Sequence, residues 1–415
     1  MSSTRQTPRN PMTARERRAT LGLASVFSMR MLGLFLVLPV FALYAHELAG
    51  ATPMMIGLAI GAYGLTQALL QIPLGMASDR WGRRPVIVAG LLLFALGSVV
   101  AALSESIYGV IAGRALQGTG AVAAAAMAMA ADLTRDSQRT KIMAVIGISI
   151  GFSFLLALML GPVIAGWWGL SGVFWFTAVM ALAGIGVMYL LVPTPEQAPA
   201  PAGMAVSEQG RLWAVFKEPN LFRLDSGIFV LHLILTASFV VMPIALRDQL
   251  GVADNAHWRV YIPVLLASVV GMVPLLALGE RRRQMHRLLG YVVLMLAAAS
   301  FLLAFSVTAG VAWLWFALWL YFVAFNTLEA SLPSMVSRYA PLEAKGAAMG
   351  VYSTSQFFGA FVGGVAGGGL YTGLGIEGVF AFCGVIALGW FFLARGLSAP
   401  VQTELAEAVI GDVKR

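Results

Sequence analysis

The chain has 415 residues, of which 59% are hydrophobic and only 11% are charged, and its mean hydropathy is +0.84. This small share of charged side chains could not cover the surface of a soluble domain of this length. The composition therefore predicts a protein that crosses a membrane many times. The net charge of +8 does not indicate nucleic-acid binding, because the basic residues lie in short clusters between apolar runs. The single cysteine, Cys383, lies inside an apolar run and excludes disulfides and cysteine-based metal sites.

The apolar runs predict an all-α membrane protein with twelve transmembrane helices in two halves of six, each helix needing about 20 residues. A polar tail, 1–19, precedes an uncleaved first helix, because no small-residue cleavage site ends that run. The first half, 20–192, has spans at about 20–45, 54–77, 85–103, 107–131, 141–166 and 172–192. After a polar linker, 193–223, the second half, 224–395, has spans at about 224–246, 258–279, 288–307, 311–334, 344–371 and 378–395, and a tail, 396–415, follows.

The basic residues predict the orientation. Most of the 27 Lys and Arg residues fall in the two tails, the linker and the loops of one side, whereas Arg247 and Arg259 fall on the other side. Positively charged segments face the cytoplasm, so we expect both termini to be cytoplasmic. Within the linker, Trp213 and Phe216 with Arg211 and Lys217 predict a short interfacial helix, and an irregular tether is the alternative.

The loop between the second and third spans has an unusual composition. Its residues 75–84 read Gly-Met-Ala-Ser-Asp-Arg-Trp-Gly-Arg-Arg. This spacing resembles the signature loop of the major facilitator superfamily, Gly-x-x-x-Asp-Arg-x-Gly-Arg-Arg/Lys. Every fixed position is filled, by Gly75, Asp79, Arg80, Gly82, Arg83 and Arg84. A plain basic anchor would explain the arginines but neither Asp79 nor the two glycines.

The second half repeats the first. With the halves aligned, Pro274 falls on Pro73, Glu280 on Asp79 and Arg281 on Arg80, so Glu280-Arg281-Arg282-Arg283 reads as a degenerate copy of the signature loop. Two parallel six-helix repeats are typical of transporters whose site lies between the halves. The resemblance to the superfamily implies this fold and alternating access. A closer resemblance, to one bacterial inner-membrane transporter of the superfamily, covers about residues 13–395.

Four ionisable residues lie inside predicted spans: Arg30, Arg114, His232 and Glu329, the last beside Asn326. An ionisable side chain in hydrocarbon costs several kcal/mol unless it faces a wet cavity or a partner. The resemblance implies a cavity, because spans one, four, seven and ten line it in the superfamily. The alternative is pairing that fixes the bundle, such as Arg30 with Glu329. Arg114 with Gly118 resembles the superfamily's fourth-span Arg-x-x-x-Gly motif, which is associated with proton coupling, and Glu329 is the expected proton carrier.

Two further motifs follow from the resemblance. Asp79 and Arg83 are expected to form a conformational latch, with Asp132 as the partner of Arg83 and the start of the eleventh span as a second partner of Asp79. The fifth span resembles the Gly-Pro-x-x-Gly-Gly motif of proton-coupled exporters, with the last pair changed to Ala165-Gly166. Its motif residues are Gly147, Gly151, Gly161, Pro162 and Gly166. Close helix packing without directional meaning is the alternative.

The sequence therefore predicts a proton-driven secondary transporter of a bacterial inner membrane that exports small or amphipathic solutes. Its partners are a small-molecule substrate, protons and the lipid bilayer, and we expect a monomer with no cofactor, metal or nucleic acid. A proton-coupled importer of a polar metabolite is the alternative; a membrane-embedded enzyme would need a clustered catalytic set, and none is visible. Some related transporters carry a soluble C-terminal domain, and we expect none after Arg395.

Overall fold

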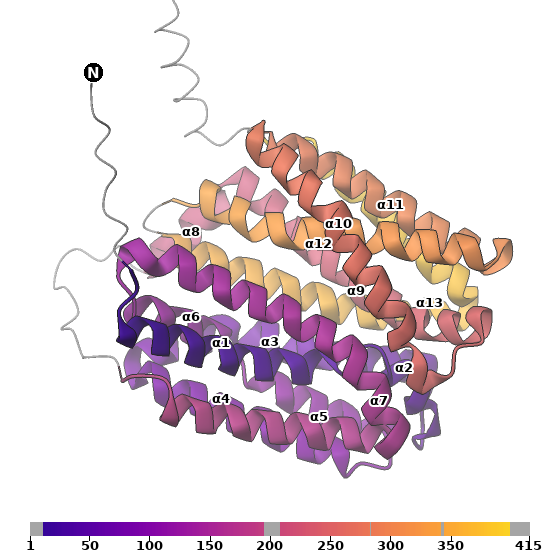
Figure 1. Ribbon diagram of the computed structural model, residues 1–415, viewed down its shortest axis with the longest axis horizontal. Coiled ribbons are helices and arrows are strands. Elements are labelled where there is room, and N and C mark those ends of the chain that lie inside the picture. The colour runs from indigo at the N-terminus through magenta and orange to yellow at the C-terminus, as the bar shows by residue number, and fades with distance from the viewer. Residues whose placement is uncertain (1–10, 195–207, 283, 342–343, 399–415) are drawn as a thin grey trace, which may run out of the picture.

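The computed structural model describes residues 11–194, 208–282, 284–341 and 344–398, and every named element in these ranges is a helix. The helices form two bundles that lie against each other (Figure 1). The first bundle contains α1 (Ala14–Phe35), α2 (Phe41–Tyr44), the 3-10 helix η1 (Ala45–Glu47), α3 (Pro53–Trp81), α4 (Arg83–Ala102), α5 (Ile107–Thr119), α6 (Ala123–Asp132) and α7 (Asp136–Leu190). The second contains α9 (Pro219–Leu250), the 3-10 helix η2 (Asp254–Ala256), α10 (Trp258–Arg281), α11 (Met285–Ala309), α12 (Val311–Tyr339) and α13 (Lys345–Ala394).

Eight helices of the described chain are long and apolar enough to cross a membrane, which is fewer than the twelve expected spans. Two of them, α7 and α13, turn back on themselves at Gly169 and Gly375, where φ is +65° and +68°. A positive φ is strained for other residues, so glycine permits each sharp turn. Two further expected spans are interrupted, the first by the turn 36–40 between α1 and α2, the fourth by residues 120–122 between α5 and α6.

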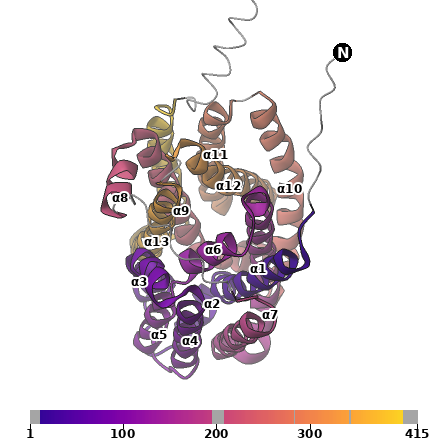
Figure 2. The same cartoon turned by 90° about the vertical axis from the view of Figure 1, so that its left-hand side faces the viewer.

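The linker between the bundles contains α8 (Glu208–Lys217), a helix of ten residues. Trp213 and Phe216 are exposed on it, and the Lys217 ammonium lies 5.7 Å from the Trp213 ring centroid. A helix here agrees with the sequence expectation. Its position at a membrane interface stays a prediction. Seen end-on, α8 lies beside the second bundle (Figure 2).

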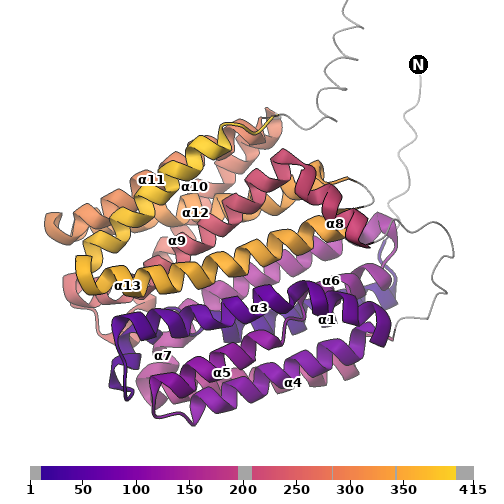
Figure 3. The same ribbon diagram turned by 180° about the vertical axis from the view of Figure 1, so that it is seen from behind.

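The two bundles meet most closely where α3 runs beside α13 (Figure 3). A Cβ on Gly57 would lie 2.1 Å from the Gly364 carbonyl oxygen, and one on Gly64 would lie 2.5 Å from the Phe357 carbonyl oxygen. Backbone of one helix therefore touches backbone of the other, which only small residues permit. This contact joins the two halves without any side chain between them.

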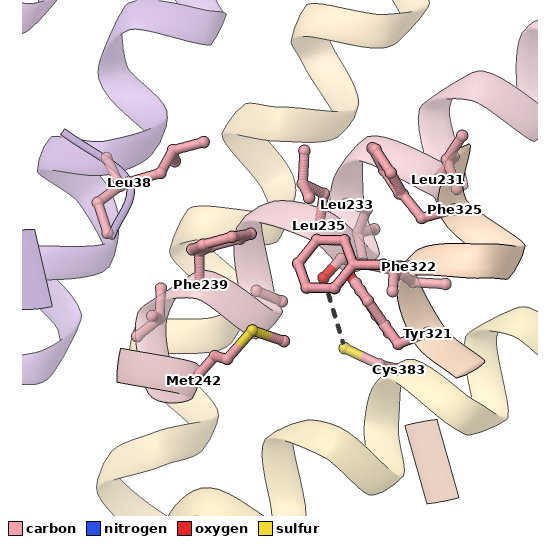
Figure 4. Close-up of a cluster of buried hydrophobic side chains, with 14 of the residues drawn as sticks. Leu38, Leu231, Leu233, Leu235, Phe239, Met242, Tyr321, Phe322, Phe325 and Cys383 are labelled. Carbon is pink, nitrogen blue, oxygen red and sulfur yellow. Dashed lines mark hydrogen bonds between the residues drawn. The ribbon is translucent and has the colours of Figure 1, made fainter. Parts of the chain in front are cut away.

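We use "terminal end" for the end of the bundle that carries the start of α1 and the turn between α3 and α4, and "opposite end" for the end that carries α2, η1 and η2 (Figure 1). At the opposite end one apolar core runs through both bundles. Leu38, from the turn after α1, belongs to the same buried cluster as Phe239 and Met242 of α9 (Figure 4). The rings of Phe154 and Phe239, one from each bundle, are 6.3 Å apart. The halves are thus packed together at this end.

At the terminal end, Glu16 fixes the start of α1 to the start of α7. Arg135 donates from Nε to Oε1 and from Nη2 to Oε2 of this buried carboxylate, both at 2.8 Å. The backbone N–H groups of Arg135 and Thr13 donate to it at 3.1 and 2.8 Å. Because of the Arg135 hydrogen bonds, the pKa of Glu16, which precedes the expected first span, lies well below its usual value of 4.5.

We expect Glu16→Gln to lower the midpoint of thermal unfolding in detergent by roughly 3 °C at neutral pH, because hydrogen bonds to a charged group contribute about 1.5–3 kcal/mol. A depressed pKa means that the ionised carboxylate stabilises the folded state above about pH 4.5 and that this stabilisation is lost as the pH falls further. The difference from wild type should therefore narrow in acid. An equal difference at neutral and acid pH would contradict this assignment.

Candidate functional site

Two polar clusters lie inside the bundles, one in each half. The first, called here the arginine cluster, consists of Arg30, Tyr63, Gln67, Arg114 and Gln117. Arg30 is 1% exposed, and its Nη2 donates to the Tyr63 hydroxyl at 2.8 Å, to Gln67 Oε1 at 2.7 Å and to the carbonyl of Gly120 at 3.2 Å. Its guanidinium is therefore held by neutral oxygen atoms from α3 and from the break before α6.

Arg114 joins α5 to α3. It is also 1% exposed, and it donates to the carbonyls of Ala59 and Ile60 at 3.3 Å each and to Gln117 Oε1 at 2.9 Å. Its guanidinium lies 5.2 Å from the Tyr63 ring centroid. One turn further along α5, a Cβ on Gly118 would lie 2.3 Å from the Tyr63 carbonyl oxygen. The Arg-x-x-x-Gly spacing thus places the Arg114 guanidinium and Gly118 on the same face of α5, where the first donates to the α3 backbone and the second lets that backbone come close.

The second group, called here the carboxyl cluster, consists of His232 on α9, Glu329 on α12 and Gln356 on α13. Gln356 Nε2 lies 2.8 Å from His232 Nε2 and donates to Glu329 Oε1 at 3.4 Å. His232 Nε2 is 3.9 Å from Glu329 Oε2. The Glu329 side chain keeps 38% of its surface exposed, whereas His232 keeps 12%. An acid, an imidazole and an amide from three helices therefore converge on one partly accessible point.

The structure separates residues that the sequence grouped together. Arg30 belongs to the arginine cluster in one half, and Glu329 belongs to the carboxyl cluster in the other half. The alternative pairing of Arg30 with Glu329 is therefore not the observed arrangement. Asn326 donates to Ser268 of α10 at 2.9 Å and takes no part in either cluster. The two clusters come near each other through aromatic rings. The ring centroids of Tyr63, in the arginine cluster, and Phe357, the neighbour of Gln356, are 6.0 Å apart.

Sequence reasoning missed the neutral members of both clusters. Gln67 donates to Gln71 at 2.9 Å, and Gln117 donates to Ser98 at 2.7 Å, so amides extend the polar network along α3 and α5. An amide inside an apolar helix also needs a hydrogen-bond partner, so these glutamines could have been counted with the charged residues. Asp225 was also missed, because it lies at the boundary of the seventh expected span.

The expected latch residues contact one another within the first half. Arg83 forms an ion pair with Asp79, and its Nε donates to Asp132 Oδ2 at 3.1 Å. Its Nη1 also donates to Ser78 at 2.7 Å. The Asp79 side chain is 52% exposed. The acid therefore pairs with α4 in this state, and its expected approach to the start of α13 stays a prediction.

The remaining signature residues shape the turn between α3 and α4. Gly82 has a φ of +92°, which a side chain would strain, so glycine is required between the two helices. A Cβ on Gly75 would lie 3.3 Å from Ala124 of α6. The Arg84 guanidinium lies 5.7 Å from the Tyr189 ring centroid near the end of α7, whereas Arg80 is exposed.

The fifth-span motif lies on the first part of α7. Its members are Gly147, Gly151, Gly161, Pro162 and Gly166. A Cβ on Gly161 would lie 2.8 Å from the Leu36 carbonyl oxygen, and one on Gly166 would lie 2.5 Å from Cβ of Asn255 in the other half. At Gly147 and Gly151 a Cβ would meet nothing within 4 Å. Close packing thus explains two of the four glycines in this state.

A cavity of about 420 Å³ lies between the halves at the opposite end. Its described lining residues are Ala42, His46, Ala51, Thr52, Pro53, Ile56, Val240, Ile244, Arg247 and Tyr371. They come from both halves, so the cavity belongs to the interface between the bundles. They include no member of the two clusters.

Residues 23–364 match the model of the Major Facilitator Superfamily. The chain belongs to this superfamily. It is 45% identical to the inner membrane transport protein YajR of Escherichia coli over 94% of this chain and 85% of that protein. It is 26% identical to the multidrug resistance protein MdtH of Aeromonas hydrophila over 82% of this chain and 84% of that protein.

Solved structures share the fold. A bacterial homologue of the human lysosomal transporter Spinster, in an inward-facing and unoccupied conformation, superposes with a TM-score of 0.74 at 14% identity, over 93% of this chain and 98% of that one. These relatives are transporters and not enzymes, and superfamily members act on small molecules within the membrane. The protein is therefore a multi-pass membrane transporter of this superfamily, with the all-helical fold that the sequence predicted.

Proposed function

We propose that the protein is a proton-coupled secondary transporter of a bacterial inner membrane, which works by alternating access as a monomer and exports small or amphipathic solutes. The observation that carries this proposal is the carboxyl cluster, in which a partly exposed acid meets a histidine and an amide from three helices. An ionisable group inside a membrane protein marks a proton or substrate pathway by default. The similarity to a multidrug resistance protein supports export.

For the topology we propose twelve spans with both termini in the cytoplasm. In this scheme α7 and α13 each cross twice, because each turns at a glycine near its middle. The pairs α1–α2 and α5–α6 each cross once as interrupted helices. The bounds proposed for the two halves, 20–192 and 224–395, follow from this scheme, with the linker 193–223 and the tails 1–19 and 396–415 outside the membrane.

The packing of the halves suggests which state is present. At the opposite end the apolar core and the contact of Gly166 with Asn255 join the two bundles. At the terminal end the described ion pairs lie within one half, such as Arg83 with Asp132 and Arg338 with Glu280. Under the proposed orientation this is a cytoplasm-facing state. Alternating access requires a second state in which the opposite end opens.

In that second state we propose that Asp79 leaves Arg83 and ties the turn before α4 to the start of α13. We expect Asp79→Asn to shift the population toward the present state. It removes the tie to α13 in the second state, whereas in the present state it removes only a half-exposed ion pair with Arg83, which contributes about 0–1 kcal/mol. The measurement is thiol labelling of a cysteine placed at Ile244, which lines the interface cavity, in a protein that also carries Cys383→Ser. Asp79→Asn should slow the labelling of this cysteine. Unchanged labelling would contradict the latch.

The proposed transport is tested with purified protein in liposomes that contain a pH dye. A panel of cationic, neutral and anionic solutes is added in turn under an imposed pH gradient. Proton flux that starts with one class of solute, and that is absent from empty liposomes, is the expected result and gives the substrate class. The direction of proton movement relative to the solute separates export by antiport from proton-coupled import. Solute uptake without proton movement would contradict the coupling.

A further inference from the structure

Buried polar atoms without a hydrogen-bond partner gather around the carboxyl cluster. Within seven residues of a member of this cluster, along the described parts of α9, α12 and α13, they are Asp225 Oδ1, His232 Nδ1, Glu329 Oε2, Tyr352 Oη and Thr354 Oγ1. Gln249 of α9 and Tyr321 of α12 have such atoms further along their helices. A buried polar atom that lacks a partner destabilises the fold, so a group of them in one region indicates a site that water or protons occupy. Three of these residues, Asp225, Tyr352 and Thr354, have no role in the transport cycle proposed above, and two of them are titratable.

Asp225 and Tyr352 continue the carboxyl cluster toward the terminal end. Asp225 is in the second turn of α9, two helical turns before His232 and so about 10 Å from it along the axis. Tyr352 is 4% exposed and lies one turn before Gln356 on the same face of α13. A Cβ on Gly359 would lie 2.1 Å from the Phe229 carbonyl oxygen, so α13 packs against α9 here, and the turn of α13 that holds Tyr352 lies beside the first turns of α9, which hold Asp225. Asp225, Tyr352 and Glu329 therefore form a row that leads into the bundle.

The surroundings of Asp225 leave its carboxyl group without a cationic partner in the described chain. The residue is 9% exposed. The nearest basic residue in sequence, Arg223, approaches Asn220 at 3.5 Å and Gly396, both at the terminal end. Besides its own members, the titratable group that approaches this row is His232 of α9, whose Nε2 lies 3.9 Å from Glu329 Oε2. A buried acid with a polar but uncharged neighbour is suited to gain and lose a proton and not to a fixed ion pair.

We propose that Asp225 is a second proton-binding site, through which Glu329 exchanges its proton with water at the terminal end. The step is a relay along Tyr352. Because the Tyr352 hydroxyl has no direct hydrogen-bond partner, a water molecule bridges it to each carboxyl group in this step. The hydroxyl accepts a proton from the water that takes one from the carboxylic acid, and it donates its own proton to the water that protonates the other carboxylate. One O–H bond breaks and one forms at the tyrosine, which stays neutral. The net result is the transfer of one proton between Glu329 and Asp225, and no co-reactant is needed.

This inference rests on the proposed proton coupling, and its test separates the two. Wild type, Asp225→Asn and Tyr352→Phe are compared in the pH-dye liposomes with the solute that gives the largest proton flux in wild type. We expect the two variants to slow that flux roughly tenfold or more, because a positioned proton donor contributes at least that much. Exchange of labelled for unlabelled solute at equal pH, which moves no net proton, should stay close to wild type.

Two controls decide between a relay and a packing role. Asp248→Asn removes an exposed carboxylate on the same helix and should leave proton flux unchanged. Asp225→Glu keeps a titratable group and should restore flux with a shifted pH profile, whereas a packing residue would respond only to size. Wild-type flux that persists in Asp225→Asn overturns the inference and leaves the proposed function standing. No proton flux in wild type overturns the coupling itself. If Asp225→Asn does not fold, Tyr352→Phe, which removes only an unpartnered hydroxyl, gives the same decision.

Discussion

Replacing Glu329 with glutamine should reduce solute-driven proton flux to the level of empty liposomes. Glutamine has the shape of glutamate and can still accept the hydrogen bond that Gln356 donates at 3.4 Å, but it cannot take up or release a proton. The loss should therefore affect coupling and not folding. Proton flux through the pH-dye liposomes and the midpoint of thermal unfolding in detergent are the two measurements, and only the first should change strongly.

The matched control is Glu280→Gln. Glu280 is a half-exposed carboxylate that pairs with Arg338 at 2.6 Å at the terminal end, so its loss removes a surface ion pair of about 0–1 kcal/mol and no buried proton site. Coupled flux should survive in this control. Coupled flux that also survives in Glu329→Gln would remove Glu329 from the mechanism and return it to a packing role.

Adding one methyl group at Gly57 should prevent the halves from closing at the opposite end. A Cβ there would lie 2.1 Å from the Gly364 carbonyl oxygen and 2.9 Å from the Gly368 Cα, both backbone atoms of α13 that cannot move independently of the helix. Gly57→Ala must therefore push α3 and α13 apart, and overpacking of this kind costs about 1–3 kcal/mol or more. We expect a lower unfolding midpoint and transport close to zero.

Thiol labelling of Ile244→Cys in the Cys383→Ser background should at the same time become faster, because the interface cavity opens. The control is Gly147→Ala, another glycine in a helix, where a Cβ meets nothing within 4 Å. Alanine favours helix by about 1 kcal/mol over glycine, so this variant should keep or gain stability. Equal stability and labelling in the two variants would show that the contact between α3 and α13 is looser than its backbone spacing indicates.

The helical fold could be predicted from local features of the chain, and the shapes of individual helices could not. Long apolar runs separated by basic loops predict membrane helices. In lipid, a single segment can satisfy all its backbone hydrogen bonds by itself only as a helix. Glycines at 118 and 120 do not by themselves locate the break at Gly120, because α13 stays helical through its own glycines at 363, 364, 367, 368 and 369. The Gly120 carbonyl accepts a hydrogen bond from Arg30, a partner that is 90 residues away in sequence. An interruption that depends on a distant side chain is decided by tertiary contact.

The candidate site divides in the same way. The cost of a charge in hydrocarbon identifies Arg30, Arg114, His232 and Glu329 from the sequence alone, because each is exceptional within its own span. Which of them meet depends on how the helices pack. The structure holds both arginines with tyrosine, amide and carbonyl oxygens in one half, and the acid with His232 and Gln356 in the other. The sequence by itself determined the membrane fold, the superfamily signature and the charged candidates. Only the tertiary structure decided their partners, because side chains on different helices meet through packing that no single helix specifies.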